Sequence, residues 1–308
     1  MIDSLVIAPE IAEAIAAGRA VVALESTIVT HGMPYPQNVA TARDVEAVVR
    51  AAGAVPATIA IIAGVIKVGL SADELEWLGT AKDVMKLSRA DLPFAVSAKR
   101  HGSTTVAATM LVAHLAGIPV FATGGIGGVH RGAETTFDIS ADLQELARTP
   151  VTVVCAGAKA LLDVPKTLEL LEMMGVPIVC YGTDDFPAFW SRTSGLPAPL
   201  RLDSPSAIAD FVRAKSALGI ESGTMIANPI PLADEISATE MAGYIENAIA
   251  DSVDAGITGK AVTPWLLDRI FKITNGKSLT ANVALVKNNA QLASEIALAL
   301  ARPLSSRA

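Results

Sequence analysis

The stretch VTVVCAGAKALLDVPKTLELLEMMGVPIVCY, residues 151–181, places one helical pattern between two short apolar runs. The runs Val151–Cys155 and Pro177–Tyr181 predict buried strands. Lys159–Met174 predicts a helix that ends at Gly175, because glycine is the usual residue after a helix C-terminus. A strand, a helix and a second strand in this order are typical of parallel strands covered by helices.

The same alternation continues on both sides of this stretch. Further strands are predicted at Val21–Leu24, Thr58–Ile62 and Val120–Thr123, and further helices at Gln37–Ala52, Thr104–Ala116 and from the capping box Ser71–Glu74 toward Leu78. Beyond residue 232 the pattern is helical, at Ala233–Ala255, Thr263–Ile273 and Leu279–Ala301. We therefore expect one compact α/β domain over residues 1–308. Its mostly parallel or mixed sheet is flanked by helices, and its C-terminal part is helical.

The composition narrows the class of protein. A net charge of −7 and a pI near 5.2 argue against a nucleic-acid-binding surface. Cys155 and Cys180 lie in apolar runs without metal-ligand spacing, which predicts buried, reduced thiols. The N-terminus lacks the basic segment of a signal peptide, so we expect a cytoplasmic protein.

One segment is long and uncharged enough to raise the question of a membrane span. No Asp, Glu, Lys or Arg occurs between Arg100 and Arg131. Gly117 and Pro119 interrupt this segment, however, and a glycine-rich stretch begins at Gly124. A buried helix, a turn, a short strand and a glycine loop fit this pattern better than a membrane helix.

Ligands of open α/β sheets bind beyond the carboxyl ends of the strands, and two ionisable residues stand there. Lys159 follows the strand that ends at Cys155. It is either an ordinary lysine in the first helical turn or an amine held in apolar surroundings, which favour the neutral form that attacks carbonyls. Glu25 follows the strand that ends at Leu24, and is either a cap or a general acid.

Three further segments carry groups that suit an anionic ligand. Lys86 lies in a small basic cluster, which is either a solvated face or an anion clamp. Gly102–Thr105 precedes a helix and suits either N-capping or a phosphate or carbonyl oxygen. The loop Gly124–Gly132 permits a close approach to the backbone, but it matches neither the dinucleotide fingerprint nor a P-loop.

Asp138, Ser140 and Asp142 place two carboxylates and a hydroxyl within one short segment. Either Asp138 or Ser140 caps the helix that follows, or a carboxylate holds a hard cation such as Mg²⁺ or Mn²⁺ that keeps several water ligands. An amine, an acid, an anion clamp and a carboxylate metal ligand together suit chemistry on a sugar phosphate that opens to its aldehyde.

At this point the residues resemble a known family, the pseudouridine-5′-phosphate glycosidases, also called the indigoidine synthase A-like family. The most specific matching blocks are FATGGIGGVHRGAETTFDISADLQELA and TVVCAGAKALLD, and others are ALESTIVTHGMPYPQN, KLSRADLP, PAFWSRTSG and TANVALVKNNAQLASEIA. The resemblance covers nearly the whole chain. It implies reversible conversion of pseudouridine 5′-phosphate and water to uracil and ribose 5-phosphate.

The resemblance also implies roles for particular residues. Lys159 is expected to be the Schiff-base nucleophile, Glu25 the proton donor and Lys86 a substrate ligand, in the first place for the phosphate. Asp138 is expected to hold Mn²⁺, mostly through water. The other residues that the resemblance places against the substrate are Ser140, Ala141 and Asp142 at the sugar phosphate, Val106, and His130 and Asn282 at uracil. Arg131 is a further candidate for the phosphate, and a homotrimer is the expected assembly.

Two other functions remain open on the residues alone. A class I aldolase acting on a phosphosugar would also place a Schiff-base lysine at a strand end, but would not need a nucleobase. A sugar-phosphate-binding protein would bind ribose 5-phosphate without turnover. The expected partner in each case is a small phosphorylated molecule, with no nucleic acid and no membrane.

Overall fold

The structure is a computed structural model that describes residues 4–257 and 262–302, and its central strands form where the chain is apolar and rich in β-branched residues. The strands are β1 (Leu5–Ile7), β2 (Val21–Leu24), β3 (Val55–Ile62), β4 (Val65–Val68), β5 (Met85–Leu87), β6 (Gly102–Thr104), β7 (Val120–Ala122), β8 (Thr152–Cys155), β9 (Ile178–Tyr181), β10 (Leu200–Leu202) and β11 (Thr224–Ala227). They form one sheet in the order β1-β4-β3-β2-β7-β8-β11-β9-β10, with β6 joined to β3 and β5 joined to β6.

The sheet is mixed but mostly parallel, as expected from the sequence. The six strands from β3 through β2, β7, β8 and β11 to β9 run parallel to one another. The strands β4 and β6 pair with β3 in the antiparallel sense. The two strands of the 151–181 stretch are parallel, yet they are not neighbours, because β11 lies between them.

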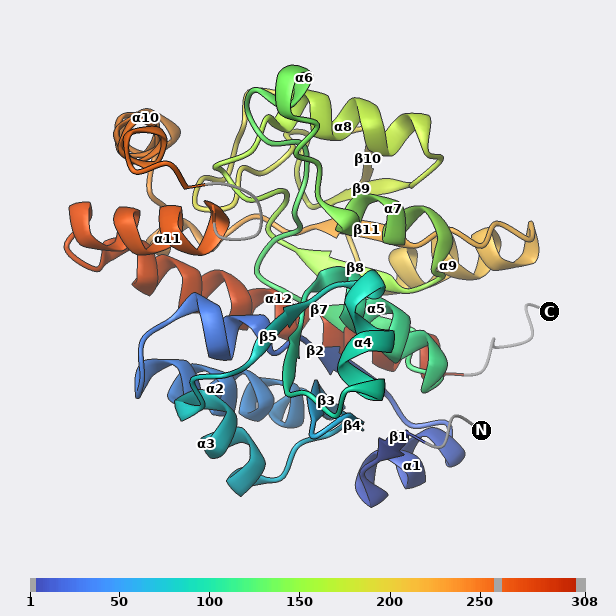
Figure 1. The fold of residues 1–308 in the computed structure, drawn as a ribbon. Helices are drawn as coiled ribbons and strands as arrows, with labels where there is room; N and C mark the ends of the chain where they lie inside the picture. Colours follow the sequence, from blue (N-terminus) through green and yellow to red (C-terminus); the bar gives the residue numbers. More distant parts are fainter. Residues whose placement is uncertain (1–3, 258–261, 303–308) are drawn as a thin grey trace.

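The helices cover both faces of this sheet (Figure 1). They are α1 (Pro9–Ala16), α2 (Gln37–Ala51), α3 (Ala72–Thr80), α4 (Leu92–Ser97), α5 (Val106–Leu115), α6 (Ala133–Thr136), α7 (Ala141–Arg148), α8 (Val164–Met173), α9 (Pro205–Ala217), α10 (Ala238–Asp254), α11 (Val262–Ile273) and α12 (Lys277–Ala301). The helices α10 to α12 form the expected helical C-terminal part, and α12 packs against β2, β7 and β8.

Alternate side chains of the central strands enter two different hydrophobic cores. Val21 and Ala23 of β2 face α1, α4, α5, α7 and α8. Val22 and Leu24 face α2 and α9 to α12. Because both faces are covered, every residue of β2 is buried, which is why the strand reads as a continuous apolar run.

Cys155 lies in the same kind of environment at the end of β8. Cys155 and Cys180 are both buried and neither forms a disulfide, as predicted. Burial raises the pKa of the Cys155 thiol to about 12, so the reactive thiolate is strongly disfavoured.

The predicted helix Lys159–Met174 was wrong at its start. The helix α8 begins at Val164, with Asp163 as its N-cap accepting the Lys166 N–H at 3.1 Å. Gly157 has φ +93°, which is incompatible with a right-handed helix, and a Cβ there would lie 2.3 Å from the Pro187 carbonyl oxygen. Lys159 therefore stands on a loop between β8 and α8. No helix in the described residues is long and apolar enough to cross a bilayer.

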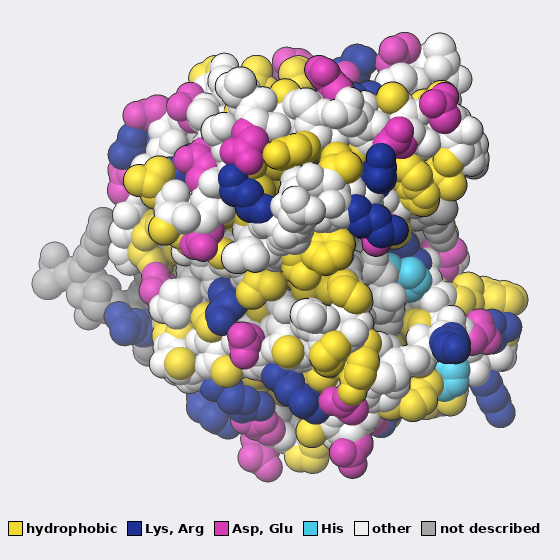
Figure 2. All heavy atoms as spheres, turned by 90° about the vertical axis from the view of Figure 1, so that its left-hand side faces the viewer, with side chains coloured by type: hydrophobic (Ala, Val, Ile, Leu, Met, Phe, Trp, Pro, Cys, Tyr) yellow, Lys and Arg dark blue, Asp and Glu magenta, His cyan; other side chains and the backbone are white. Residues whose placement is uncertain are grey.

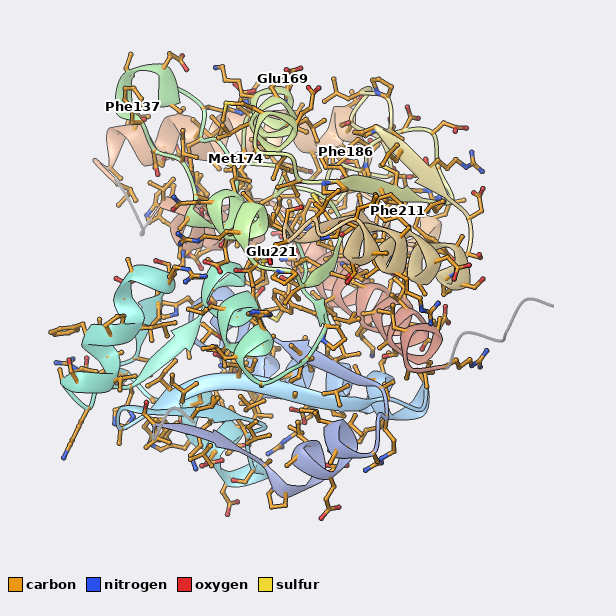
Figure 3. The ribbon with its side chains drawn as sticks, turned by 90° about the vertical axis from the view of Figure 1, so that its right-hand side faces the viewer. Phe137, Glu169, Met174, Phe186, Phe211 and Glu221 are labelled. Carbon is orange, nitrogen blue, oxygen red and sulfur yellow. The ribbon has the colours of Figure 1, made fainter. Side chains whose placement is uncertain are left out.

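The short helix α6 is followed by Phe137, near the edge of the molecule. The Phe137 side chain is 83 % exposed and lies at the outer end of this segment (Figure 3). The chain then returns to the body through Asp138 and Ile139, which line the main cavity. On the face that carries α10 and α11, acidic and basic side chains are interspersed around a more hydrophobic middle (Figure 2).

Candidate active site

A cavity of about 300 Å³ lies at the carboxyl ends of β2, β7 and β8, where ligands of such sheets bind. All ten residues predicted from the sequence line it: Glu25, Lys86, Val106, His130, Asp138, Ser140, Ala141, Asp142, Lys159 and Asn282. The structure therefore brings these residues together, while the role of each stays a prediction. Arg131 is exposed and is not among the lining residues.

Glu25 lies directly beyond β2, and the Thr123 hydroxyl beyond β7 donates a hydrogen bond to its carboxylate. Burial raises the pKa of Glu25, because it disfavours the charged carboxylate. Lys159, the hydrogen bond from Thr123 and Lys86 act in the opposite direction without cancelling this effect. A carboxyl group in these surroundings suits the role of a proton donor.

Lys159 is positioned by the backbone of the glycine loop. Its N–H donates to the Ile126 carbonyl at 3.0 Å, and the Ile126 N–H donates to the Gly157 carbonyl at 3.2 Å. The Asp163 N–H donates to the Val129 carbonyl at 2.8 Å. The two loops thus continue the β7–β8 pairing beyond the sheet, so the lysine is held on a fixed backbone.

Asp142 organises the turn around the glycine loop. One carboxylate oxygen accepts the Ala107 N–H of α5 at 2.9 Å, and the other accepts the Gly127 N–H at 2.8 Å. A Cβ on Gly127 would lie 2.2 Å from the Ser140 hydroxyl, so only glycine fits here. The carboxylate that was expected to contact a sugar phosphate therefore also joins α5, α7 and the loop.

The first turns of α5 and α7 border the cavity, where their backbone N–H groups could bind an anion. Thr105 caps α5, and Ser140 caps α7 by accepting the Asp142 N–H at 3.3 Å. The capping interpretation of Ser140 is thus confirmed, and the hydroxyl lines the cavity as well. Backbone N–H groups at helix N-termini bind phosphate, and Lys86 of β5 lies in the same cavity.

His130 and Asp138 lie close together on paired backbone segments. The His130 N–H donates to the Asp138 carbonyl at 3.0 Å, and His130 Nδ1 is 4.0 Å from the Asp138 carboxylate. Burial lowers the pKa of His130, and Lys159 and Lys86 add to this effect while Asp138 opposes it. The neutral imidazole is therefore favoured near neutral pH, with one nitrogen as donor and one as acceptor.

The Asp138 side chain is 35 % exposed, and it faces the cavity. Among the described residues no group of three or more His, Cys, Asp and Glu side chains converges as a metal site. One carboxylate is nevertheless enough for a hard cation that keeps most of its water ligands. The site fits that kind of metal binding, and not a site whose ligands all come from protein.

Asn282 of α12 is oriented by a neighbouring tryptophan. The Trp190 indole N–H donates to Asn282 Oδ1 at 2.8 Å. Because an indole N–H can only donate, this bond fixes the orientation of the amide. The amide nitrogen, with two donors, remains for a carbonyl oxygen of a ligand.

Comparison with known proteins agrees with this geometry. The family model for indigoidine synthase A-like proteins matches residues 10–299. The chain belongs to the indigoidine synthase A-like family. It is 67 % identical over 299 residues to a protein of Methylobacterium nodulans, with 97 % of this chain and 89 % of the relative covered. It is 64 % identical over 293 residues to a protein of Solibacter usitatus, covering 95 % of this chain and 98 % of the relative. Both relatives are named pseudouridine-5′-phosphate glycosidase.

Two solved structures share the fold of this chain. The prealnumycin C-glycosynthase AlnA, solved in complex with ribulose 5-phosphate, is 38 % identical with a TM-score of 0.90. An indigoidine synthase A-like protein from Thermotoga maritima is 33 % identical with a TM-score of 0.87. Each comparison covers 97 % of this chain and 97 % of the other.

Several cavity residues of this family member escaped the sequence analysis. His31, in the segment between β2 and α2, lines the cavity, and its Nδ1 bonds the Thr30 hydroxyl at 2.5 Å. Burial and the nearby Lys86 lower the pKa of His31. Phe189 and Leu267 also line the cavity and are apolar. Apolar residues such as these gave no chemical signal, because the same side chains occur throughout a core.

Proposed function

We propose that this protein catalyses the reversible cleavage of pseudouridine 5′-phosphate to uracil and ribose 5-phosphate. The observation that carries the proposal is the convergence of Glu25, Lys86 and Lys159 on one cavity. They come from three distant segments of the chain. Relatives that are 64 % and 67 % identical are named for this activity, and the AlnA structure associates the fold with a C-glycosynthase and a sugar phosphate.

The proposed reaction breaks a C–C bond, which explains the need for an amine. Glu25 protonates the ribose ring oxygen while Lys159 Nζ adds to C1′ and opens the ring. The resulting ammonium nitrogen gives a proton to C5 of uracil as its freed lone pair expels that carbon, and C1′ is left as a protonated imine on Lys159. Water hydrolyses this imine and releases ribose 5-phosphate, the neutral Lys159 amine and one proton. An oxocarbenium route with two carboxylates would not make carbon a good leaving group.

The remaining residues are assigned to binding. Lys86 and the N-terminal turns of α5 and α7, with Val106, Ser140, Ala141 and Asp142, would hold the sugar phosphate. His130 and Asn282 would bind the uracil edge through their donors and acceptors. Asp138 would hold Mn²⁺, whose positive charge would offset the negative charge of the phosphate. The homotrimer and the cytoplasmic location stay predictions.

Incubation with uracil and ribose 5-phosphate, followed by mass detection of pseudouridine 5′-phosphate, tests this function. We expect product formation, its loss in Lys159→Ala, and a lower rate after chelation that Mn²⁺ restores. A sugar phosphate that is cleaved without uracil would favour the class I aldolase instead. Binding of ribose 5-phosphate without any turnover would favour the binding protein.

A further inference from the structure

A second, much smaller cavity adjoins Glu25. It has a volume of about 20 Å³, which is enough for one water molecule. Glu25 lines both this cavity and the main one. Its other polar lining comes from the threonines Thr41, Thr58 and Thr123. A single water in this cavity would be surrounded by a carboxyl group and hydroxyls. Without the water, those polar groups would be poorly solvated.

Thr58 connects the small cavity to a second carboxyl group. Its hydroxyl on β3 donates to Glu46 Oε1 on α2 at 2.5 Å. Glu46 is partly exposed, so it can exchange protons with solvent. Burial raises the pKa of Glu46 as it does that of Glu25. Both groups are therefore carboxyls that take up a proton more readily than an ordinary surface glutamate.

The proposed reaction creates a need for such a connection. Glu25 gives up its proton in each cleavage, while the nucleotide occupies the main cavity in front of it. The small cavity reaches the same carboxyl group from outside the substrate site. A proton donor in this position would regain its proton through the second cavity without waiting for products to leave.

We propose that Glu46 reprotonates Glu25 through the Thr58 hydroxyl and one water molecule in the small cavity. The Thr58 hydroxyl donates to Glu46 when this carboxylate is ionised. Once Glu46 is protonated, its O–H donates to Thr58 Oγ1 and the Thr58 O–H turns toward the water. The Glu46 carboxyl then passes its proton to Thr58 Oγ1, Thr58 passes its own proton to the water, and the water passes one to the Glu25 carboxylate. One proton is transferred in total, and Glu46 regains it from solvent. Glu46 is thus a relay residue that acts through Glu25, and the inference rests on the proposed function.

Other charged groups bear on both ends of this path. Lys159, Lys86 and Asp142 influence Glu25 from the loop after β8, from β5 and from α7. Arg50, Arg43 and Glu10 influence Glu46 from α2 and α1. The two arginines oppose protonation of Glu46 but do not overcome the effect of burial. Replacing the Glu46 carboxyl by the amide of Gln therefore interrupts the relay while leaving these groups in place.

The test compares Glu46→Gln and Thr58→Val with wild type in the release of uracil from pseudouridine 5′-phosphate. We expect kcat to fall roughly tenfold in each, less than on loss of a general acid, with KM little changed. The rate should then rise with the concentration of a small acidic buffer, and Thr58→Ser should restore it. Asp44→Asn is the matched control, because Asp44 is on the same helix but pairs with Lys287 at the surface.

Wild-type kcat, pH profile and buffer independence in both variants would overturn the relay. A high-resolution crystal structure gives a second readout that does not depend on turnover. We expect a water within hydrogen-bonding distance of Glu25 and Thr58, and an empty cavity would contradict the path even in an active enzyme. If the wild-type protein releases no uracil, the proposed function fails first and the relay with it.

Discussion

Glu25 is the residue at which catalysis and stability oppose each other. Its carboxylate is poorly solvated, so the pKa of Glu25 lies above that of an ordinary glutamate. The native state therefore binds this proton more tightly than the unfolded chain does. Between the ordinary pKa, about 4.3, and the raised one, this group lowers the stability of the fold as the pH rises.

We expect Glu25→Gln to be inactive and yet more stable than wild type above that pH window. The loss of a general acid lowers kcat by about 10²–10⁴. The stability gain should vanish in acid, where Glu25 is protonated, and the wild-type cleavage rate should fall as rising pH deprotonates it. Uracil release and urea unfolding across a pH series check this. A variant that is equally destabilised at every pH would contradict the account.

The chemical type of a residue could be read from the sequence, but its hydrogen-bond partners could not. The chemical types of Lys159, Glu25 and Asp138 were informative, since an amine and carboxyls near the predicted strand ends and loops suit chemistry on a carbonyl compound, although each could also have served as a helix cap or a solvated side chain. The dual use of Asp142 was not visible, because its partners Ala107 and Gly127 are backbone groups distant in the chain. Nor could the chain order show that Trp190 orients Asn282.

At the scale of elements, an ion pair fixes α7 against the segment that follows β5. Arg89 donates to both oxygens of Glu145, from Nε at 2.6 Å and from Nη2 at 2.5 Å. The Glu145 side chain is fully buried and that of Arg89 is 33 % exposed. The pair therefore joins the segment after Lys86 to α7, whose N-terminus is proposed to hold the phosphate together with Lys86.

We expect Glu145→Gln to weaken substrate binding more than catalysis. KM for pseudouridine 5′-phosphate should rise several-fold, with a smaller change in kcat. The fold should lose about 2 kcal/mol, below the value for a fully buried pair because solvent reaches Arg89. Steady-state kinetics and calorimetry measure both. The control Glu134→Gln removes the exposed pair with Lys166 and should alter neither, and an unchanged KM in Glu145→Gln would contradict the role of the pair.

Elements with strong patterns were predictable, and short ones were not. The central strands β2 and β8 were placed within a residue, because burial on both faces leaves a continuous apolar run. The helix α2 was placed equally well, because its buried residues recur with the helical period. The strand β11 was missed, since four residues before a proline-rich segment carry little pattern. The start of α8 was misplaced although Asp163 and Pro165 mark it, because an apolar run continues from the strand into the loop.

At the scale of the whole molecule, the sheet brings residues that are distant in the sequence into one site. Residues between Glu25 and Asn282 reach a single cavity because parallel strands end at the same edge and α12 lies across them. This convergence was predictable from the alternation of strands and helices. The second cavity behind Glu25 was not, since it depends on the side-chain packing of α2, β3 and α12 rather than on any pattern in the chain.

The proposed mechanism requires an imine between Lys159 and ribose 5-phosphate. The decisive measurement is intact-mass spectrometry with peptide mapping, after the protein is mixed with ribose 5-phosphate and borohydride. We predict one reduced sugar-phosphate adduct per chain, located on Lys159 and absent from Lys159→Arg. An adduct on another lysine, or equal labelling of Lys159→Arg, would contradict it.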